Sequence, residues 1–273
     1  MPKISIVVPL YNKENSIGST IQSVLSQSFT DFDLVVVDDG STDGSAAVVG
    51  EFHDGRIRLV WQENSGPAAA RNKGVDHAQG EWLIFLDADD EFLPDALQIY
   101  AQLVEEHPDA DIIDCGQILK SNGSMWQMCH TLEGYSRNPV RDWYYGRIGP
   151  GANHSVFSRK YIKKYPYNTQ LRRFEDADLL IRMLKTARVY SSTIPTSLVH
   201  CDYSSASMKR DNIVEDYVGH LSFVGVDFWT KMCIYRLYLE NRVLYPEEMR
   251  RLYPTWSYRY DLLLLYKLLN IFR

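Results

Sequence analysis

The stretch WLIFLDADD, residues 82–90, decides the fold that this sequence predicts. Its first five residues are apolar and read as a buried strand, and Asp87, Asp89 and Asp90 follow directly. Ionised carboxylates are costly to bury, so they are expected where the strand leaves the core. The stretch therefore predicts an acidic cluster at the edge of a sheet.

Similar apolar runs alternate with helical patterns over the first 106 residues. Apolar strands that are separated by helices are typical of a parallel sheet covered on both faces. The fold class predicted is therefore α/β. The expected strands are 4–8, 34–37, 57–61 and 82–86, and the expected helices are 14–27, 45–52, 67–77 and 94–106.

The second half of the chain is less regular. Residues 112–143 show little periodicity, and Ser121-Asn122-Gly123 predicts a hairpin turn. A helical pattern returns at 176–186. From residue 212 onward the sequence reads as helical, with breaks expected at Tyr245-Pro246 and Tyr253-Pro254.

Composition argues against several classes of protein. The sequence has no run of eighteen apolar residues, and MPKISIVVPLYN offers no signal peptide, so neither a membrane span nor export is expected. The net charge of -6 argues against nucleic acid as the main partner. The cysteines lack CxxC spacing, so we expect reduced thiols and no zinc site. They are Cys115, Cys129, Cys201 and Cys233.

Polar clusters close three of the predicted strands. VVPLYN ends in Pro9, Tyr11 and Asn12, VVVDDGSTDGS carries Asp38 and Asp39, and WLIFLDADD ends in the acidic cluster. Ligands of open α/β sheets bind outside the carboxyl ends of the strands, so these clusters should converge. An Asp-x-Asp pair beside phosphates suits Mg²⁺ or Mn²⁺. The sequence predicts a metal-dependent site for a phosphorylated ligand, with a nucleotide favoured.

Simpler interpretations exist for each cluster. Asp38 and Asp39 are also typical of turns and helix caps, and Asp89 and Asp90 are suitable caps for the helix that follows. A calcium loop starting at Asp39 is rejected, because its twelfth position is Gly50 and a strand precedes it. Neither a phosphate loop nor a GxGxxG motif is present.

Five motifs together resemble family 2 glycosyltransferases. SIVVPLYN, LVVVDDGSTDGS, NSGPAAARNKG, WLIFLDADD and FEDADLLIRM occur in that family's order and spacing. The resemblance implies a GT-A fold with a mainly parallel central sheet, and inverting transfer of a sugar from a nucleotide-diphosphate donor with a divalent metal. It implies a catalytic domain over 1–211, split into a nucleotide-binding half (1–110) and an acceptor and sugar half (111–211), and a helical extension over 212–273.

The resemblance also assigns the nucleotide site. It places Pro9 and Tyr11 at the nucleotide, with Tyr11 stacked on the base. Asp39 would accept a hydrogen bond from the imide N–H of the base, which favours uracil and hence a UDP-sugar. Arg71 would lie near the base or the diphosphate, the alternative being an arginine on a helix surface.

The metal site follows from the same resemblance. Asp89 is the implied ligand of Mn²⁺ or Mg²⁺, and Asp87 contacts the ribose and a metal-bound water. Asp90 is expected to be only a cap. His200, in VHCDYSSASMKR, is a candidate contact to the metal or to phosphate. An arginine that many relatives carry in this segment is absent. Weaker candidates for contacts to the diphosphate follow His200 and are Tyr203, Ser205, Ser207 and Lys209.

The resemblance places the catalytic base at Asp176 and gives Glu175 the role of orienting the acceptor. An inverting transfer needs one carboxylate to remove the proton of the attacking hydroxyl. Asp178 lies about 200° away from Asp176 on a helix. The alternative is that these acidic residues only favour a helix N-terminus. His154, in GPGANHSVFSRKYI, is a weak candidate for a hydrogen bond at the donor sugar.

The implied function is transfer of a single sugar, of hexosyltransferase type, in assembly of bacterial cell-surface polysaccharide. QxxRW and the membrane helices of processive synthases are missing. The acceptor is expected to be a glycan or a lipid-linked glycan, and the location cytoplasmic. The final helix either packs on protein, including a twin subunit in a homodimer, or touches the inner membrane leaflet with its basic face. That face comprises Arg259, Lys267, Asn270 and Arg273.

Two other functions compete with this one. A catalytically silent nucleotide-sugar-binding protein or partner subunit would have the same fold, but the presence of Asp89 and Asp176 argues against it. A sugar nucleotidyltransferase would show a loop rich in glycine and arginine near its N-terminus, which VVPLYNKENS is not.

Overall fold

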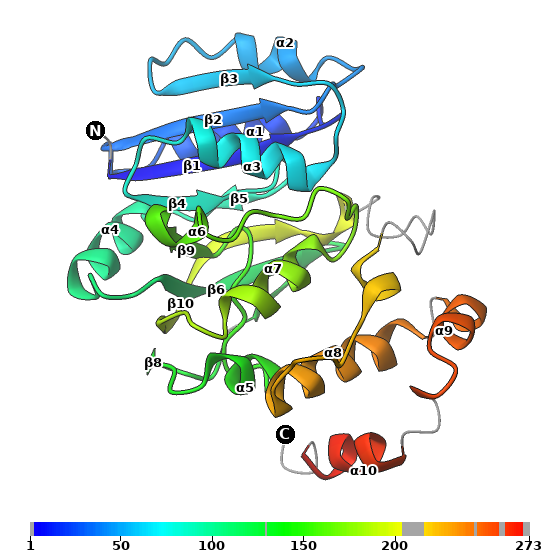
Figure 1. Ribbon diagram of the computed structural model, residues 1–273. Coiled ribbons are helices and arrows are strands. Elements are labelled where there is room, and N and C mark those ends of the chain that lie inside the picture. Colours follow the sequence, from blue (N-terminus) through cyan, green and yellow to red (C-terminus); the bar gives the residue numbers. More distant parts are fainter. Residues whose placement is uncertain (1–2, 129, 204–215, 243–244, 257–259, 270–273) are drawn as a thin grey trace.

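A computed structural model describes residues 3–128, 130–203, 216–242, 245–256 and 260–269 (Figure 1). The strands are β1 (Ile4–Leu10), β2 (Phe32–Asp38), β3 (Ile57–Trp61), β4 (Trp82–Phe85), β5 (Glu91–Phe92), β6 (Ile112–Ser121), β7 (Ser124–Met128), β8 (Gly134–Tyr135), β9 (Ser155–Ser158) and β10 (Val189–His200). The α-helices are α1 (Ile17–Leu25), α2 (Ser45–Gly50), α3 (Pro67–His77), α4 (Ala96–Glu106), α5 (Pro139–Tyr144), α6 (Arg159–Ile162), α7 (Glu175–Met183), α8 (Phe228–Asn241), α9 (Pro246–Leu252) and α10 (Tyr260–Leu269). Two short 3₁₀ helices are η1 (Cys201–Tyr203) and η3 (Tyr217–His220).

These strands form one sheet in the order β3-β2-β1-β4-β9-β6-β10-β5, with β7 beside β6 and β8 beside β10. β1 to β4 run parallel, as predicted for the nucleotide-binding half. β9 lies antiparallel between β4 and β6, so the other half of the sheet is mixed. The hairpin turn predicted at residues 121–123 joins β6 to β7, with Asn122 and Gly123 at φ values of 48° and 76°.

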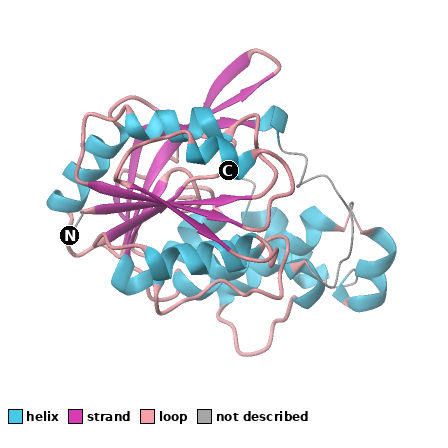
Figure 2. Cartoon of the chain, turned by 90° about the horizontal axis from the view of Figure 1, so that it is seen from above, coloured by secondary structure: helices cyan, strands magenta, loops and turns pink. Residues whose placement is uncertain are grey.

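Helices lie on both faces of the sheet (Figure 2), and the central strands β1, β2 and β4 are almost wholly buried, which explains their apolar runs. In β1, Ile4, Ile6 and Val8 join the core that contains α1 and α4. Val7 points to the opposite core, which contains residues of α3 and α7. A strand that contacts helices on both sides cannot alternate polar and apolar residues, so its sequence is continuously hydrophobic.

The C-terminal helices share the second of these cores. Tyr235 and Tyr238 of α8 are almost fully buried, and Trp256 stacks on Phe223 with ring centroids 3.9 Å apart. α8 ends at residue 241 and α9 occupies 246–252, so both predicted breaks are confirmed. The predicted domain boundary at residue 211 lies outside the described residues and stays a prediction. Among the helices that the structure describes, none combines the length and apolar character needed to cross a bilayer.

Candidate active site

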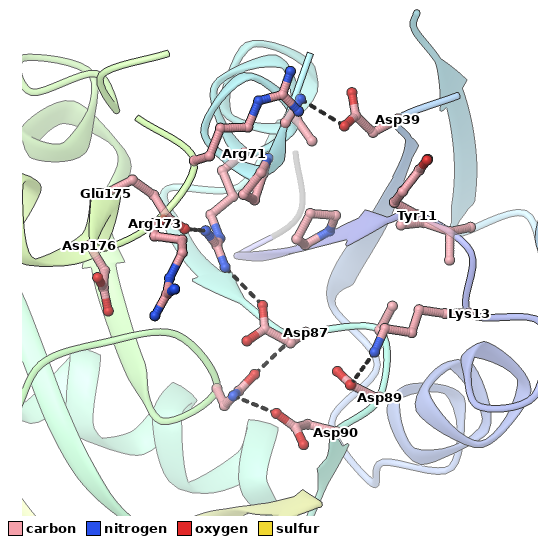
Figure 3. Close-up of a pocket in the computed structure, with 18 of the residues that line it drawn as sticks. Tyr11, Lys13, Asp39, Arg71, Asp87, Asp89, Asp90, Arg173, Glu175 and Asp176 are labelled. Atoms are coloured by element: carbon pink, nitrogen blue, oxygen red, sulfur yellow. Dashed lines mark hydrogen bonds and ion pairs between the residues drawn. The ribbon is translucent and has the colours of Figure 1, made fainter. Parts of the chain in front are cut away.

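A cavity of about 750 Å³ opens where β1, β2 and β4 end (Figure 3). Pro9 and Tyr11 line it from β1, Asp39 from β2, and Asp87 and Asp89 from β4. The convergence of the three polar clusters, predicted from the parallel sheet, is therefore confirmed. The cavity also reaches the N-terminus of α7, so residues far apart in sequence share one site.

Asp39 is held in place by three N–H donors. Its Oδ1 atom accepts from Gln62 Nε2 at 2.6 Å and from the backbone N–H of Ser65 at 2.8 Å. Its Oδ2 atom accepts from the backbone N–H of Gly66 at 2.9 Å. The side chain is almost completely buried, yet it borders the cavity. A carboxylate fixed in this way presents a negative edge to whatever enters beside it.

Tyr11 lines the cavity on the same side as this carboxylate (Figure 3) and is 47% exposed. The residue after it, Asn12, has a φ of 51°, and its Oδ1 accepts from the backbone N–H of Thr42 at 2.8 Å. This bond ties the end of β1 to the loop after β2. An exposed aromatic ring beside a fixed carboxylate is a suitable arrangement for stacking a base.

Arg71 is a buried bridge between two parts of the site. Its guanidinium donates to Asp87 Oδ1 at 2.9 Å and to Glu175 Oε1 at 2.6 Å. Burial lowers the pKa of this guanidinium, but Asp87, Tyr167 and Glu175 outweigh that effect and raise it well above its ordinary value. The surface-arginine alternative is therefore wrong. Arg71 connects α3, β4 and α7 at the cavity wall.

Asp89 is paired with Lys13, whose ammonium contacts its Oδ2 atom. Both side chains are partly buried, and both line the cavity. Lys13 therefore compensates the negative charge of the Asp-x-Asp pair. The sequence reasoning did not assign this lysine, although its position two residues after Tyr11 placed it at a strand end.

Asp90 does not cap a helix, so that prediction was wrong. α4 begins later, at residue 96, and its N-cap is Asp95. Asp90 instead is buried and accepts from the backbone N–H of His200 at 2.8 Å and from Asn153 Nδ2 at 2.7 Å. Burial raises the pKa of this carboxyl to about 8, with Asp87 adding to the effect.

The two acidic residues at the start of α7 differ in environment. Glu175 is buried against Arg71, whereas Asp176 is exposed at the cavity edge, and its Oδ1 accepts from the backbone N–H of Ala177. Burial raises the pKa of Glu175, and Arg71 opposes that shift. Asp178 is paired with Arg182 at 2.8 Å, away from the residues that line the cavity. Asp176 is thus the acidic residue of this helix that faces an incoming ligand.

His200 lines the cavity at the end of β10, beside the acidic turn. Its Nε2 atom lies 3.1 Å from Glu91 Oε1, and its backbone is bound by Asp90. Its assignment to a metal or phosphate stays a prediction. The weaker candidates Ser205, Ser207 and Lys209 lie outside the described residues, and no side-chain position is described for Tyr203.

Several cavity residues were missed by the sequence reasoning. Asn153, rather than His154, reaches the cavity, and its Oδ1 accepts from the backbone N–H of Asp87 at 2.7 Å. His154 does not line the cavity, so a hydrogen bond from it to a donor sugar stays a prediction that the cavity lining does not favour. Arg172 and Arg173 also line the cavity, directly before the acidic pair of α7. The double arginine in RRFEDADLL was the available signal.

The acidic turn suits a hard divalent cation. Asp87, Asp89 and Asp90 place three carboxylates within one short turn, and their mutual repulsion contributes to the raised pKa of Asp90. Oxygen ligands of this kind favour Mg²⁺ or Mn²⁺, with phosphate oxygens and water completing the shell. The residues present therefore fit the metal that the fold family implies.

An α/β sheet whose strand ends enclose a cavity lined by an Asp-x-Asp pair is the arrangement expected for a GT-A fold. The chain belongs to glycosyl transferase family 2, because that family matches residues 5–166, more than half of its length. The crystal structure of S. aureus TarS in complex with UDP-GlcNAc has a TM-score of 0.73 and 19% identity, over 88% of this chain and 73% of that chain. This likeness confirms the predicted fold.

Curated relatives agree with the family. An uncharacterized glycosyltransferase of Rickettsia felis is 41% identical over 106 residues, 38% of this chain. The putative teichuronic acid biosynthesis glycosyltransferase TuaG of Bacillus subtilis is 40% identical over 108 residues, again 38% of this chain. The chain spans only 18% of the length of the first protein and 43% of the second through these matches.

Proposed function

We propose that this chain is an inverting glycosyltransferase that moves a single sugar from a UDP-sugar to a glycan acceptor. The observation that carries the proposal is the single cavity shared by Asp39, the Asp-x-Asp pair and Asp176. Family membership and the UDP-GlcNAc complex of TarS support a nucleotide-sugar donor. Catalytic turnover is favoured over silent binding because the site combines an exposed acidic residue, Asp176, with positively charged side chains that line the cavity.

The donor would lie with its base between Tyr11 and Asp39. The imide N–H of uracil would donate to the Asp39 carboxylate, which its three protein donors hold in position. The diphosphate would then extend toward the acidic turn. Lys13 and Arg172, both on the cavity wall, are suitably charged to meet it. They would supply positive charge in place of the arginine that many relatives carry after β10.

A Mg²⁺ or Mn²⁺ ion held by Asp89, with Asp87 nearby and His200 as a further candidate ligand, would neutralise charge on the departing diphosphate. The protein's own residues arrange the rest of the site. Arg71 fixes Asp87 relative to α7, and Asn153 fixes the backbone of the same aspartate. These contacts keep the acidic turn in one position while the donor enters.

Asp176 would act as the general base. The acceptor hydroxyl oxygen attacks the anomeric carbon, the bond from that carbon to the phosphate oxygen breaks, and the hydroxyl proton passes to Asp176. UDP leaves with the electron pair, and the configuration at carbon inverts. Glu175 is buried against Arg71, so its role is to position that arginine and, through it, the acceptor side of the site.

The experiment that tests this function compares Asp176→Asn with the wild type. The variant should bind UDP as the wild type does, but its transfer rate should fall about 10²–10⁴-fold because the base is missing. Asp178→Asn, on the same helix and paired with Arg182, is the matched control and should retain activity. Substantial transfer by the Asp176 variant would move the base elsewhere.

A thermal-shift panel tests the donor. UDP and UDP-sugars should raise the melting temperature more than CDP, GDP or their sugars, and Mn²⁺ should increase the effect. A protein that no UDP-linked donor stabilises, with or without Mn²⁺, would overturn the uracil assignment.

We further propose a role in cell-surface polysaccharide assembly at the cytoplasmic side of the membrane, with a lipid-linked acceptor. The name of TuaG supports the class of product. In α10, Leu262 is buried, while Leu265 and Leu268 are exposed, so the helix has both a packed and an available apolar face. Liposome flotation decides between membrane contact and packing on protein or on a second subunit. A chain without residues 257–273 that floats as well as the full chain would refute membrane contact.

A further inference from the structure

Three metal-ligating side chains meet away from the acidic turn. They are Asp114 on β6, His130 after β7 and His154 before β9. His130 Nε2 lies 3.7 Å from Asp114 Oδ2, and His154 Nε2 lies 3.7 Å from Asp114 Oδ1. One donor atom from each residue lies within 4.8 Å of the others. None of the three lines the donor cavity.

The cluster is buried but incompletely hydrogen-bonded. Asp114 has no exposed surface, His154 is 6% exposed and His130 is 9% exposed. His130 Nε2 and His154 Nδ1 are buried without a hydrogen-bond partner. Burial lowers the pKa of His130, which favours its neutral ring. An unpartnered buried nitrogen is unfavourable, so His130 Nε2, which lies 3.7 Å from a carboxylate oxygen of Asp114, points to a missing ligand.

The surroundings resemble those that orient metal ligands in proteins. Asp114 Oδ2 accepts from the backbone N–H of Gly149 at 2.9 Å, and Asp114 Oδ1 accepts from Ser155 Oγ at 3.1 Å. The ring of His130 bonds to the backbone of Gly146, and Nε2 of His154 lies 2.9 Å from Gly149 O. The contacts of Asp114 and His130 are outer contacts of the kind that fix the direction of a ligand, whereas the bond of His154 uses Nε2 itself, the atom that faces Asp114.

Gly149 is also required by shape. A Cβ atom at this position would lie 2.2 Å from Cε1 of His130, so no larger residue fits beside the ring. The absence of a side chain at Gly149 therefore allows the backbone at this position to lie directly against the ring of His130.

We propose that Asp114, His130 and His154 bind a divalent transition-metal ion, with Zn²⁺ the best match. Two imidazoles and one carboxylate suit Zn²⁺ better than Mg²⁺ or Mn²⁺, which favour oxygen. The 3.7 Å separations are close to the roughly 3.4 Å between ligand atoms about 2.1 Å from a tetrahedral ion. The prediction that the chain lacks a zinc site rested on its cysteines, and this site uses none.

Ion binding requires a proton rearrangement at His154. Without the ion, its Nε2–H donates to the carbonyl oxygen of Gly149. With the ion bound, Nε2 supplies a lone pair and the proton resides on Nδ1, the atom that now lacks a partner. The carbonyl oxygen of Gly149 would lose this hydrogen bond and would be available as a further oxygen donor.

The ion would stabilise the floor of the donor cavity. Asn153 precedes His154 directly, and its side chain binds both the backbone of Asp87 and the carboxylate of Asp90. An ion that ties His154 to β6 would therefore restrict movement of the acidic turn. Its role is structural, and it is separate from the cation expected at Asp89.

The test uses the full chain, stripped with EDTA and reloaded with Zn²⁺ or Co²⁺ in the absence of nucleotide. We expect about one ion per chain by elemental analysis, and tetrahedral visible absorption from Co²⁺. Zn²⁺ at about a hundred times its Kd should raise the melting temperature by roughly 5–10 °C. Wild-type protein that binds neither ion would overturn the proposal.

Variants assign the ion to the cluster. His130→Ala should lose the ion, whereas Asp89→Asn should retain it, and so should His53→Asn, which alters an exposed histidine elsewhere. His130→Cys covers the case in which the alanine variant does not fold, because a Co²⁺-bound thiolate adds a charge-transfer band absent from the wild type. Loss of the ion in Asp89→Asn, or its retention in His130→Ala, would overturn the proposal.

Discussion

The substitution Asp39→Asn tests how the site selects its base. Three N–H groups already donate to the two oxygens of this carboxylate, two to Oδ1 and one to Oδ2. An asparagine keeps only one oxygen, so its NH₂ group must face a donor. The less costly orientation places NH₂ at the Oδ2 position, against the backbone N–H of Gly66, because only one hydrogen bond is then lost.

The expected loss of affinity follows from the energy of hydrogen bonds to charged groups. Such a bond contributes about 1.5–3 kcal/mol, so the Kd for UDP should rise about 10–150-fold. Cytosine presents an acceptor where uracil presents an imide N–H, and the amide of asparagine can donate to it. CDP should therefore lose much less affinity than UDP, and the preference for UDP should shrink or reverse.

Calorimetric titration of UDP and CDP in the presence of Mn²⁺ measures these changes. Asp38→Asn is the matched control: Asp38 is as buried as its neighbour and accepts from the backbone N–H of Ser41 at 2.9 Å, but it does not line the cavity. The Asp38→Asn variant should be less stable than the wild type but should bind UDP with unchanged affinity. An Asp39→Asn protein whose UDP affinity stays within about threefold would refute the assignment, as would an equal loss in the control.

Two further predictions concern stability. In EDTA-treated protein, Asp90 has a raised pKa of about 8. The stabilisation of the folded state by its protonated carboxyl is therefore fully present below about pH 4 and is lost as pH rises toward about 8. Between about pH 5 and pH 7, the free energy of unfolding measured in urea should fall by up to about 2–3 kcal/mol more in the wild type than in Asp90→Asn. If the free energies of unfolding of the two proteins change in parallel with pH, the raised pKa is contradicted. Gly74→Ala should destabilise, because its Cβ would lie 2.2 Å from Val7 Cγ1, and overpacking of about 1–3 kcal/mol exceeds the helix gain. Gly50→Ala has no atom within 4 Å and should be neutral or stabilising by up to about 1 kcal/mol; equal melting temperatures for the two variants would contradict the packing argument.

The parts of the site that were predictable are those that depend on one strand at a time. A buried parallel strand has a continuous apolar run, so its end is visible in sequence, and all such ends meet at one edge. The strand pattern alone therefore brings Tyr11, Asp39, Asp87 and Asp89 to one cavity. The resemblance to family 2 glycosyltransferases then added Asp176, which no strand pattern could locate.

The contacts that could not be predicted belong to residues whose partners lie on distant elements. Asp90 has the local spacing of a helix cap, but its partners are the backbone of His200 and the side chain of Asn153. Arg71 has the setting of a surface arginine, but it binds Glu175, which is 104 positions away. Asn153 reaches Asp90 because β9, which follows it, enters the sheet antiparallel between β4 and β6. His200 lies at the end of β10 and Glu175 at the start of α7, and no periodicity in the sequence encodes where these elements pack.

Backbone conformation marks the same region as exceptional. Among the described non-glycine residues, five have positive φ, and three of these border the cavity or follow a residue that does: Asn12, Asn153 and Phe174. Asparagine tolerates this region, but phenylalanine rarely adopts it, so the φ of 55° at Phe174 requires support from its surroundings. That support comes from the next residue, Glu175, whose ion pair with Arg71 anchors the start of α7. The start of α7, which carries Asp176, is thus joined to α3 by a buried ion pair, and local sequence preferences do not encode that contact.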